Sequence, residues 1–364
     1  MKTLLFTLEY PPFKGGIAHY YSNLVKYWPK KDNIFVLNNN DGSLLSFKFF
    51  PKWFSSFFVL NKTIHKNKIE HIIVGHILPL GTVVFFLSRF YNFKYSVILH
   101  GMDLEYALKN SRKKFLAKLI LKNADTIIST NSYVEKKVLK FLGDKYEEKS
   151  FIVHPGLSLD DFSYDIKEQK AFLNFRKKYD LDHQFVLFTL GRLVKRKGQD
   201  KTIKAVRDLK EHIPDLHYYI AGEGKDEKYL KDLAQDLDYV HFLGLINEEE
   251  KKMWMKNCDI FIMPSRNIKG DVEGFGIVYL EAGLAGKAVV AGRSGGVEDA
   301  VLDYETGILV DADNPDSIYD AVLELYRDFD LRAELAYNGM KRVLSSFLWK
   351  EQARKFFNYI NRNF

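Results

Sequence analysis

The sequence is poor in cysteine. Cys258 is the single cysteine among 364 residues. One thiol can form neither an internal disulfide nor a cysteine-based metal cluster. Because Cys258 lies in the apolar run CDIFIMP, we expect a buried structural thiol rather than a nucleophile. A reducing compartment is consistent with this usage.

Long apolar runs are missing as well. The run Leu4 to Leu8 is shorter than the core of a signal peptide, and the run Ile77 to Leu87 ends before it could span a bilayer. We therefore expect a protein that is cytoplasmic or peripheral to a membrane.

Several catalytic motifs are absent. The sequence has no Ser-His-Asp nucleophile motif and no His or Cys cluster with metal-ligand spacing. Asp311-Ala-Asp313 has the spacing of some metal sites, but Asn314-Pro315 follows it directly, which favours a turn. We therefore expect no metal at this position.

The composition is that of a globular protein, with 46% hydrophobic and 28% charged residues, and the length suggests two domains. Charge is uneven, because residues 1–160 hold 23 Lys and Arg against 12 Asp and Glu, whereas the remainder holds 31 against 35. Phe47 to Leu60 interleaves aromatic residues with Lys48 and Lys52. This pattern suits an anionic membrane surface, and it equally suits core aromatics beside solvated lysines. No nucleic-acid recognition motif accompanies the basic charge, so we expect no nucleic-acid partner.

Short β-branched or aromatic runs alternate with helical patterns along the whole chain, which predicts an α/β fold with parallel sheets. Two series of six strands are separated by a polar stretch, so we expect a first domain at 1–160 and a second at 161–345. A last helix pattern within 346–364 could pack back on the first domain. Two doubly wound sheets in tandem would place the carboxyl ends of their strands on either side of a cleft. The expected strands are Thr3–Leu8, Ile34–Leu37, His71–Val74, Tyr95–Leu99, Thr126–Ser129 and Phe151–Val153, then Phe185–Leu190, His217–Ala221, Val240–Phe242, Ile260–Met263, Ala288–Ala291 and Gly307–Val310.

Two motifs follow strands of the first series. Gly15 and Gly16 stand between the first strand and a helix from Ile17, where bare backbone amides could approach an oxyanion; a plain turn is the alternative. His100 follows the apolar strand YSVIL and could donate a hydrogen bond into the cleft, or it could cap the next turn.

Two cations follow the first strand of the second series. Arg192 comes directly after FVLFTLG, and Lys197 precedes Gly198, where the next helix starts. Two cations at a helix N-terminus can neutralise a diphosphate. For the neighbours Lys195 and Arg196 we expect solvated surface charge.

The segment RNIKGDVEGFGIVYLE carries two acids eight residues apart. Gly274 and Gly276 precede an expected helix from Ile277 to Ala285, and such a helix start is an anion site. Glu273 would lie ahead of this helix and Glu281 about a turn and a half inside it. The two acids would therefore meet different parts of one elongated ligand.

Taken in order, the Gly15-Gly16 pair, His100, Arg192 with Lys197, and the two glutamates resemble glycosyltransferase family 4, and the resemblance covers nearly the whole chain. The segments EYPPFKGGIAHY, GRLVKRKGQD and DVEGFGIVYLEAGLAGKAVVAGRSGGVEDAV are similar to phosphatidylinositol mannosyltransferases of that family, which use GDP-mannose at the cytoplasmic membrane face. The resemblance implies the GT-B fold, with two Rossmann-like domains across a cleft. It also implies retention of anomeric configuration and no metal or other cofactor.

The resemblance further implies a role for each matching residue. Arg192 and Lys197 would bind the donor diphosphate, with Gly15 and Gly16 beside it, and Glu281 would hold the ribose hydroxyls. The transferred sugar would meet His100, Glu273 and the amides of Phe275, Gly276 and Ile277. The segment from Asn38 to Lys68, where acceptors bind in this family, shows no such match, so the acceptor is left open.

The leading hypothesis is a hexosyltransferase that moves mannose from GDP-mannose to a glycan or lipid-linked acceptor of a cell-surface polymer. A UDP-hexose is the second donor considered. A sugar-nucleotide epimerase on the same layout is an alternative enzyme, and it would turn over donor without acceptor. A non-enzymatic nucleotide-sugar or membrane-binding module is the third reading, and it would bind donor without transfer.

Overall fold

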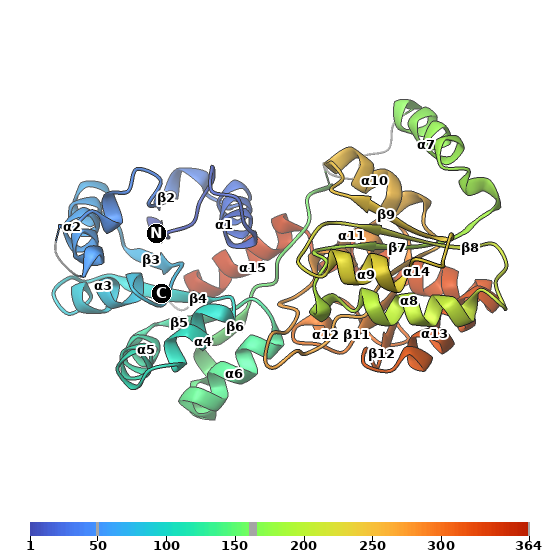
Figure 1. Cartoon of the computed structure of the whole chain (residues 1–364). Coiled ribbons are helices and arrows are strands. Elements are labelled where there is room, and N and C mark those ends of the chain that lie inside the picture. The colour runs from blue at the N-terminus through green and yellow to red at the C-terminus, as the bar shows by residue number, and fades with distance from the viewer. Residues whose placement is uncertain (49–50, 160–165, 363–364) are drawn as a thin grey trace. The chain divides into compact units, whose positions relative to one another are not determined.

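The computed structural model describes residues 1–48, 51–159 and 166–362. The chain divides into two compact units. The first contains Met1–Gly156 and the C-terminal segment from Trp349, and the second contains Leu157–Leu348. Each unit is built around its own parallel sheet (Figure 1).

The first unit has a six-stranded parallel sheet in the order β2-β1-β3-β4-β5-β6. The chain runs from β1 to β2 on one side and then crosses to β3 on the other side of β1, so the strand order reverses between β1 and β3. The strands are β1 (Thr3–Phe6), β2 (Ile34–Leu37), β3 (His71–Val74), β4 (Lys94–Leu99), β5 (Thr126–Ser129) and β6 (Ser150–Ile152). The helices are α1 (Gly16–Lys26), α2 (Ser55–Asn67), α3 (Leu80–Leu87), α4 (Met102–Leu108), α5 (Ser111–Asn123), α6 (Ser132–Leu142) and α15 (Trp349–Arg362).

Both faces of this sheet are buried. Side chains alternate along a strand, so Leu4 and Phe6 of β1 join the apolar core that contains residues of α2, α3 and α5, while Leu5 joins the core that contains residues of α1 and α15. Helix α15 packs through its aromatic residues, since Phe356 meets the ring of Trp28 edge-on at 5.8 Å. The last helix of the chain is therefore part of the first unit.

The second unit repeats the arrangement, with strand order β12-β11-β10-β7-β8-β9. Here the order reverses between β7 and β10. The strands are β7 (Phe185–Leu190), β8 (Leu216–Ala221), β9 (Val240–Gly244), β10 (Ile260–Met263), β11 (Ala288–Gly292) and β12 (Ile308–Val310). The helices are α7 (Ile166–Lys178), α8 (Gln199–Leu209), α9 (Glu227–Leu233), α10 (Glu248–Asn257), α11 (Ile277–Leu284), α12 (Val297–Ala300), α13 (Pro315–Arg327) and α14 (Phe329–Ser346).

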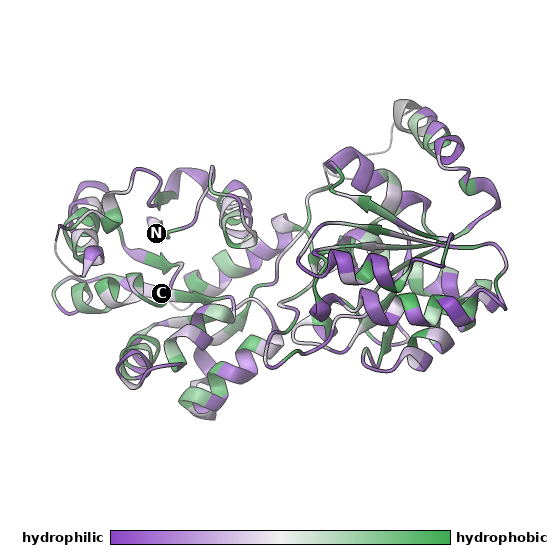
Figure 2. Cartoon of the chain, in the orientation of Figure 1, coloured by the Kyte–Doolittle hydropathy of each residue, from purple (hydrophilic) through white to green (hydrophobic). Residues whose placement is uncertain are grey.

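Hydropathy explains why these segments form layers. The strands are mainly hydrophobic, whereas the helices that cover them carry both hydrophobic and hydrophilic positions (Figure 2). Such helices bury one side against the sheet and present the other to water. Ligands of doubly wound sheets bind outside the carboxyl ends of the strands, at the point where the strand order reverses. The candidate ligand-binding sites are therefore at the β1/β3 and β7/β10 reversals.

The strand predictions are confirmed. Five of the twelve strands have the predicted bounds, and the others differ by at most two residues at an end. The predicted burial of Cys258 is also confirmed, since the side chain is 1% exposed. Among the described residues, no helix combines the length and the apolar character that a membrane crossing requires.

Candidate active site

The loop after β7 returns Lys197 toward the end of that strand. Lys195–Lys197 form one short 3-10 turn, and Gly198 caps α8 with a φ of 79°. A Cβ at Gly198 would lie 2.1 Å from the carbonyl oxygen of Pro264, so this position requires glycine. Lys197 Nζ packs over Gly191, where an added Cβ would lie 3.7 Å from it. The tight turn therefore brings a lysine ammonium to the carboxyl end of β7.

Glu273 is the centre of a buried ionic cluster. Its Oε2 lies 2.6 Å from Lys197 Nζ and 2.5 Å from Arg196 Nη1. Ser265, just after β10, donates from its hydroxyl to the same oxygen at 3.3 Å. The three ionic residues are between 6 and 8% exposed. The cluster thus joins the loops after β7 and β10, at the point where the strand order reverses.

Arg196 corrects an expectation drawn from the sequence. Its guanidinium is not solvated, because Nε also pairs with Asp271 Oδ1 at 3.1 Å while Nη1 binds Glu273. Lys195, one residue earlier, is exposed as expected. Arg192 is exposed at the carboxyl end of β7.

The electrostatics of the cluster follow from burial and from these pairs. Burial by itself would raise the pKa of Glu273, but the charges of Lys197 and Arg196 hold it below its usual value. Burial lowers the pKa of Lys197, Arg196 and Arg192 add to that effect, and Glu273 opposes it. Three cations thus share a small region with one buried carboxylate and with the exposed Asp271, which leaves positive charge for an anionic ligand.

The glycine segment leads into α11 as the sequence predicts. Gly276 caps the helix with a φ of 79°, and a Cβ there would lie 2.3 Å from the Tyr279 ring. Phe275 is 6% exposed, and its ring lies 5.9 Å from that of Phe347. Ile277 is the first residue of α11. The opening amides of a helix have no carbonyl partner within it, so this turn can bind a negative or hydroxyl oxygen.

Glu281 has a different environment from Glu273. It lies on α11, is 9% exposed, and its Oε1 binds Lys251 Nζ of α10 at 2.9 Å. Lys251 also pairs with the exposed Glu248 at 2.6 Å. Burial opposes the charge on Lys251, yet the two carboxylates raise its pKa. The two acids therefore meet different partners.

A second buried ion pair supports the same loops. Both oxygens of Asp200 on α8 accept from Arg266 Nη2, at 3.0 and 2.8 Å. The backbone N–H of Arg266 donates to the carbonyl of Arg196 at 2.8 Å. These contacts tie the loop after β10 to the loop after β7, and they hold Arg196 toward Glu273.

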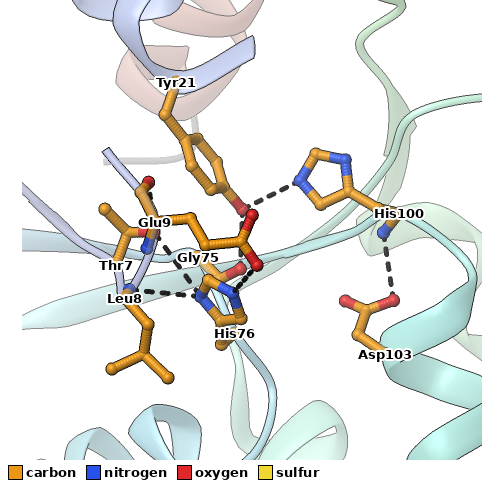
Figure 3. A network of polar contacts seen from close by, with 8 residues as sticks. All are labelled: Thr7, Leu8, Glu9, Tyr21, Gly75, His76, His100 and Asp103. Atoms are coloured by element: carbon orange, nitrogen blue, oxygen red, sulfur yellow. Dashed lines mark hydrogen bonds and ion pairs between the residues drawn. The ribbon is translucent and has the colours of Figure 1, made fainter. Parts of the chain in front are cut away.

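The remaining predicted site residues lie in the first unit. Gly15 caps α1, and Gly16 is its exposed first residue with open space where a Cβ would stand. His100 follows β4, one strand beyond β3. Its side chain belongs to a network of polar contacts at the carboxyl ends of the strands (Figure 3).

The hydrogen bonds of this network define the state of His100. The Tyr21 hydroxyl donates to the Gly75 carbonyl at 2.7 Å, so its oxygen can only accept from His100 Nε2 at 2.9 Å. Burial and the nearby His76 lower the pKa of His100 to about 3, so the ring is neutral at pH 7. The Nε2 proton is therefore used within the protein. Instead of donating to a ligand, His100 offers Nδ1 as an acceptor, and in Figure 3 this atom points away from Tyr21.

Asp103 fixes the loop that carries His100. Its Oδ1 accepts from three backbone N–H groups, those of His100, Gly101 and Leu104, at 2.9 to 3.1 Å. Its Oδ2 is buried and has no hydrogen-bond partner among the residues that the structure describes. Burial raises the pKa of Asp103 to about 6 although the backbone bonds oppose the shift. This carboxyl positions the start of α4 and the preceding histidine.

The predicted residues therefore fall into two groups. Arg192, Lys197, Glu273, Glu281 and the 275–277 segment belong to the second unit, and Gly15, Gly16 and His100 belong to the first. Sequence reasoning missed Arg196, Lys251, Asp200 with Arg266, and the Glu9–His76 pair of Figure 3. The sequence did offer one signal for two of these residues, which is their position in the chain: Arg196 closely follows β7, and His76 closely follows β3. In the described parts of the chain, no group of three or more His, Cys, Asp or Glu residues is arranged to hold a metal ion.

Comparison with known proteins adds to this geometry. A family described as glycosyl transferases group 1 matches residues 172–342. An enzyme of Mycolicibacterium smegmatis, a GDP-mannose-dependent alpha-(1-6)-phosphatidylinositol monomannoside mannosyltransferase, is 31% identical over 301 residues, which cover 81% of this chain and 77% of the relative. The chain belongs to the group 1 glycosyl transferases.

Other glycosyl transferases resemble the chain over its full length. A GDP-mannose-dependent mannosyltransferase of Corynebacterium glutamicum that is named for monoacylated phosphatidylinositol monomannoside is 27% identical over 380 residues, covering 99% of this chain and 97% of the relative. The solved structure of HepE from Anabaena in complex with UDP is similar with a TM-score of 0.79 at 19% identity, covering 100% of both chains. At this identity the likeness concerns the fold. This glycosyltransferase has the predicted GT-B fold, with two α/β units in one chain.

Proposed function

We propose that the chain is a retaining glycosyltransferase of family 4 that transfers a hexose, most simply mannose from GDP-mannose, to a glycan or lipid-linked acceptor in cell-surface polysaccharide or glycolipid synthesis. The observation that carries the proposal is the buried Lys197–Glu273–Arg196 cluster beside Arg192 at the β7/β10 reversal. Positive charge beside a carboxylate suits a ligand with an anionic part and a hydroxyl-bearing part. The two mannosyltransferase relatives support the choice of donor.

Each residue then has a chemical task. Arg192 and Lys197 bind the diphosphate and stabilise the charge that develops on it as the anomeric C–O bond breaks. Glu281 holds the ribose hydroxyls. Glu273 Oε1 accepts a hydroxyl of the sugar, because among the described residues the protein bonds of this carboxylate are all made by Oε2. The amides of residues 275–277 bind the same sugar.

The first unit contributes Gly16, whose amide would lie beside the diphosphate, and His100. The acceptor oxygen attacks the anomeric carbon on the face that the leaving group vacates, and the leaving phosphate oxygen takes the acceptor proton. This assignment requires no metal ion and no other cofactor. Because the Nε2 proton of His100 is donated to Tyr21, Nδ1 accepts a hydrogen bond from a sugar hydroxyl.

The direct test is a thermal-shift panel of GDP-, UDP- and ADP-sugars followed by transfer assays with the best donor. A ligand that binds only the folded protein raises the midpoint of unfolding. We expect the largest rise with GDP-mannose, and a product whose anomeric configuration matches the donor by NMR. An inverted product would contradict retention, and no stabilisation by any nucleotide sugar would contradict the proposal.

A UDP-hexose is the second candidate donor. HepE has been solved with UDP and, in another crystal, with UDP-glucose, at 19% identity to this chain in both cases. The same panel separates the two donors. Incubation with donor alone separates a transferase from an epimerase, because an epimerase converts the sugar without acceptor.

Association with the inner face of the cell membrane is a further part of the proposal. Phe54 and Phe58, at the start of α2, are 39 and 65% exposed, and Lys52 and Lys62 beside them are exposed too. Exposed aromatics next to basic residues suit an anionic lipid surface.

Cosedimentation with anionic vesicles tests this association. We expect binding that falls with rising salt and with Phe58→Ser. Phe329→Ser is the matched control, since Phe329 is 66% exposed in the second unit. Equal binding to neutral vesicles would exclude the electrostatic part.

A further inference from the structure

Two neighbouring tyrosines of α1 lie against the His100 ring. The rings of Tyr20 and Tyr21 meet the imidazole edge-on, with centroids at 5.1 and 5.3 Å, and both residues are buried. The Tyr20 hydroxyl donates to the Val153 carbonyl at 3.0 Å, whereas the Tyr21 hydroxyl accepts from His100 Nε2 at 2.9 Å (Figure 3). The two tyrosines therefore have similar surroundings but differ in one hydrogen bond to the histidine.

The direction of the Tyr21 bond is set by the backbone at the end of β3. The Tyr21 hydroxyl donates to the carbonyl of Gly75, the residue after this strand, at 2.7 Å. A Cβ on Gly75 would lie 2.9 Å from Thr7 Oγ1 and 3.1 Å from Cε2 of Tyr21, so glycine lets the tyrosine ring approach the strand end. A carbonyl oxygen has no proton to give, so the hydroxyl uses its own proton there and accepts from the imidazole.

The opposite tautomer of His100 is disfavoured by this arrangement. With the ring proton on Nδ1, the Tyr21 hydroxyl would have to donate to Nε2 and would no longer donate to the buried Gly75 carbonyl. Loss of the partner of a buried polar group shifts an equilibrium by about 5- to 150-fold. Burial also keeps the ring neutral at pH 7, so the form with both nitrogens protonated is not populated. Tyr21 therefore leaves Nδ1 without a proton.

We propose that Tyr21 is a positioning residue that determines donor specificity, because it fixes the proton of His100 on Nε2. The site then accepts a hydroxyl at Nδ1 and rejects a group that has no proton to donate, such as a fluorine or a carboxylate. The inference rests on the proposed function, in which His100 meets the transferred sugar. It adds Tyr21 to that site, and it restricts the donor to sugars that carry a hydroxyl where they face His100.

The tautomer is tested on the full chain without any substrate. The histidine rings are labelled with 15N, NMR spectra at pH 7 identify the protonated nitrogen, and His100→Gln assigns the His100 signal. We expect the proton on Nε2 in the wild type and a measurable share of Nδ1-protonated rings in Tyr21→Phe. Tyr20→Phe is the matched control, because it removes a buried hydroxyl beside the same ring and keeps the Nε2 bond, so its spectrum should match the wild type. A wild-type proton on Nδ1, or an unchanged tautomer in Tyr21→Phe, would overturn the inference.

Calorimetry tests the specificity. The probes are the nucleotide sugar that stabilises the wild type most and its analogues in which one sugar hydroxyl at a time is replaced by fluorine. One analogue should bind the wild type about 2- to 13-fold more weakly, the scale of one neutral hydrogen bond, and Tyr21→Phe but not Tyr20→Phe should reduce this loss to below about twofold. If no nucleotide sugar bound, the proposed function would be refuted, and the NMR result would still decide whether Tyr21 fixes the tautomer. If donors bound but no analogue showed a loss that Tyr21→Phe removes, the inference would be overturned.

Discussion

Replacing Lys197 with alanine tests the proposed diphosphate site most directly. The ammonium lies 2.6 Å from Glu273 Oε2, is nearly buried, and packs over Gly191 at the end of β7. A hydrogen bond to a charged group contributes about 1.5–3 kcal/mol, so the dissociation constant for GDP-mannose should rise by about 10- to 150-fold. The same increase is expected for GDP, because both ligands carry the diphosphate.

The variant should still fold. Removing one partner of a buried ion pair costs about 3–5 kcal/mol when the other charge is left unpaired. Glu273 keeps Arg196 Nη1 at 2.5 Å, so the free energy of unfolding should fall by less than that. A urea titration measures this change separately from binding.

Lys195→Ala is the matched control. It removes the same charge from the same 3-10 turn, but the Lys195 side chain is exposed. Calorimetric titrations of wild type and both variants with GDP and GDP-mannose should show the loss in Lys197→Ala alone. If both variants lost affinity equally, the effect would be general charge attraction, and if neither lost affinity, Lys197 would not contact the diphosphate.

Three further results are expected. Glu273→Gln should abolish the preference for GDP-mannose over GDP. Glu281→Ala should weaken the binding of both ligands by about 1.5–3 kcal/mol. If calorimetry found the same pattern for the two variants, the separate sugar and ribose roles would be contradicted. Burial raises the pKa of Asp103 from 3.8 to about 6, so the folded protein holds this proton more tightly than the unfolded chain. The unfolding free energy should therefore fall by up to about 3 kcal/mol as pH rises through this window. Asp103→Asn should remove that part of the slope in melting curves, and an unchanged slope would refute the assignment. Gly198→Ala should destabilise by about 1–3 kcal/mol or more in urea titrations, because φ is 79° and the Pro264 carbonyl blocks the Cβ; a neutral result would mean that this loop adapts.

The strands were predictable because their signal is local. A parallel strand buried on both faces reads as a short apolar run, as in FVLFTL of β7 or IFIM of β10, and the bounds of both were predicted correctly. The ends of the strands were harder to predict where polar or small residues continue a strand. Strand β9 runs two residues beyond its predicted end, to Gly244, because it pairs with β8 there.

Charged residues were harder to place because burial depends on tertiary contacts. In the triplet Lys195-Arg196-Lys197 the sequence predicts solvated charge for the first two residues, yet the short turn before Gly198 exposes Lys195 and buries Arg196 together with Lys197. Lys251 sits among four other charged residues at the start of α10, and only the packing of α10 near α11 brings it to Glu281. Residue type and spacing do not distinguish Arg196 or Lys251 from the charged residues beside them.

In the proposed function Glu273 binds the sugar and Lys197 binds the diphosphate, and Arg196 makes these two roles compatible. If Lys197 were the sole partner of Glu273, a diphosphate that drew the ammonium away would leave a buried carboxylate unpaired, at a cost of several kcal/mol. Arg196 stays on the same oxygen through its Nη1, is held by Asp271 through Nε, and is tied through its backbone carbonyl to Arg266. It can therefore keep Glu273 ionised when the donor arrives. We expect Arg196→Met to lose discrimination between GDP-mannose and GDP without losing GDP itself. Equal loss of both ligands in a calorimetric titration would show instead that Arg196 binds the diphosphate.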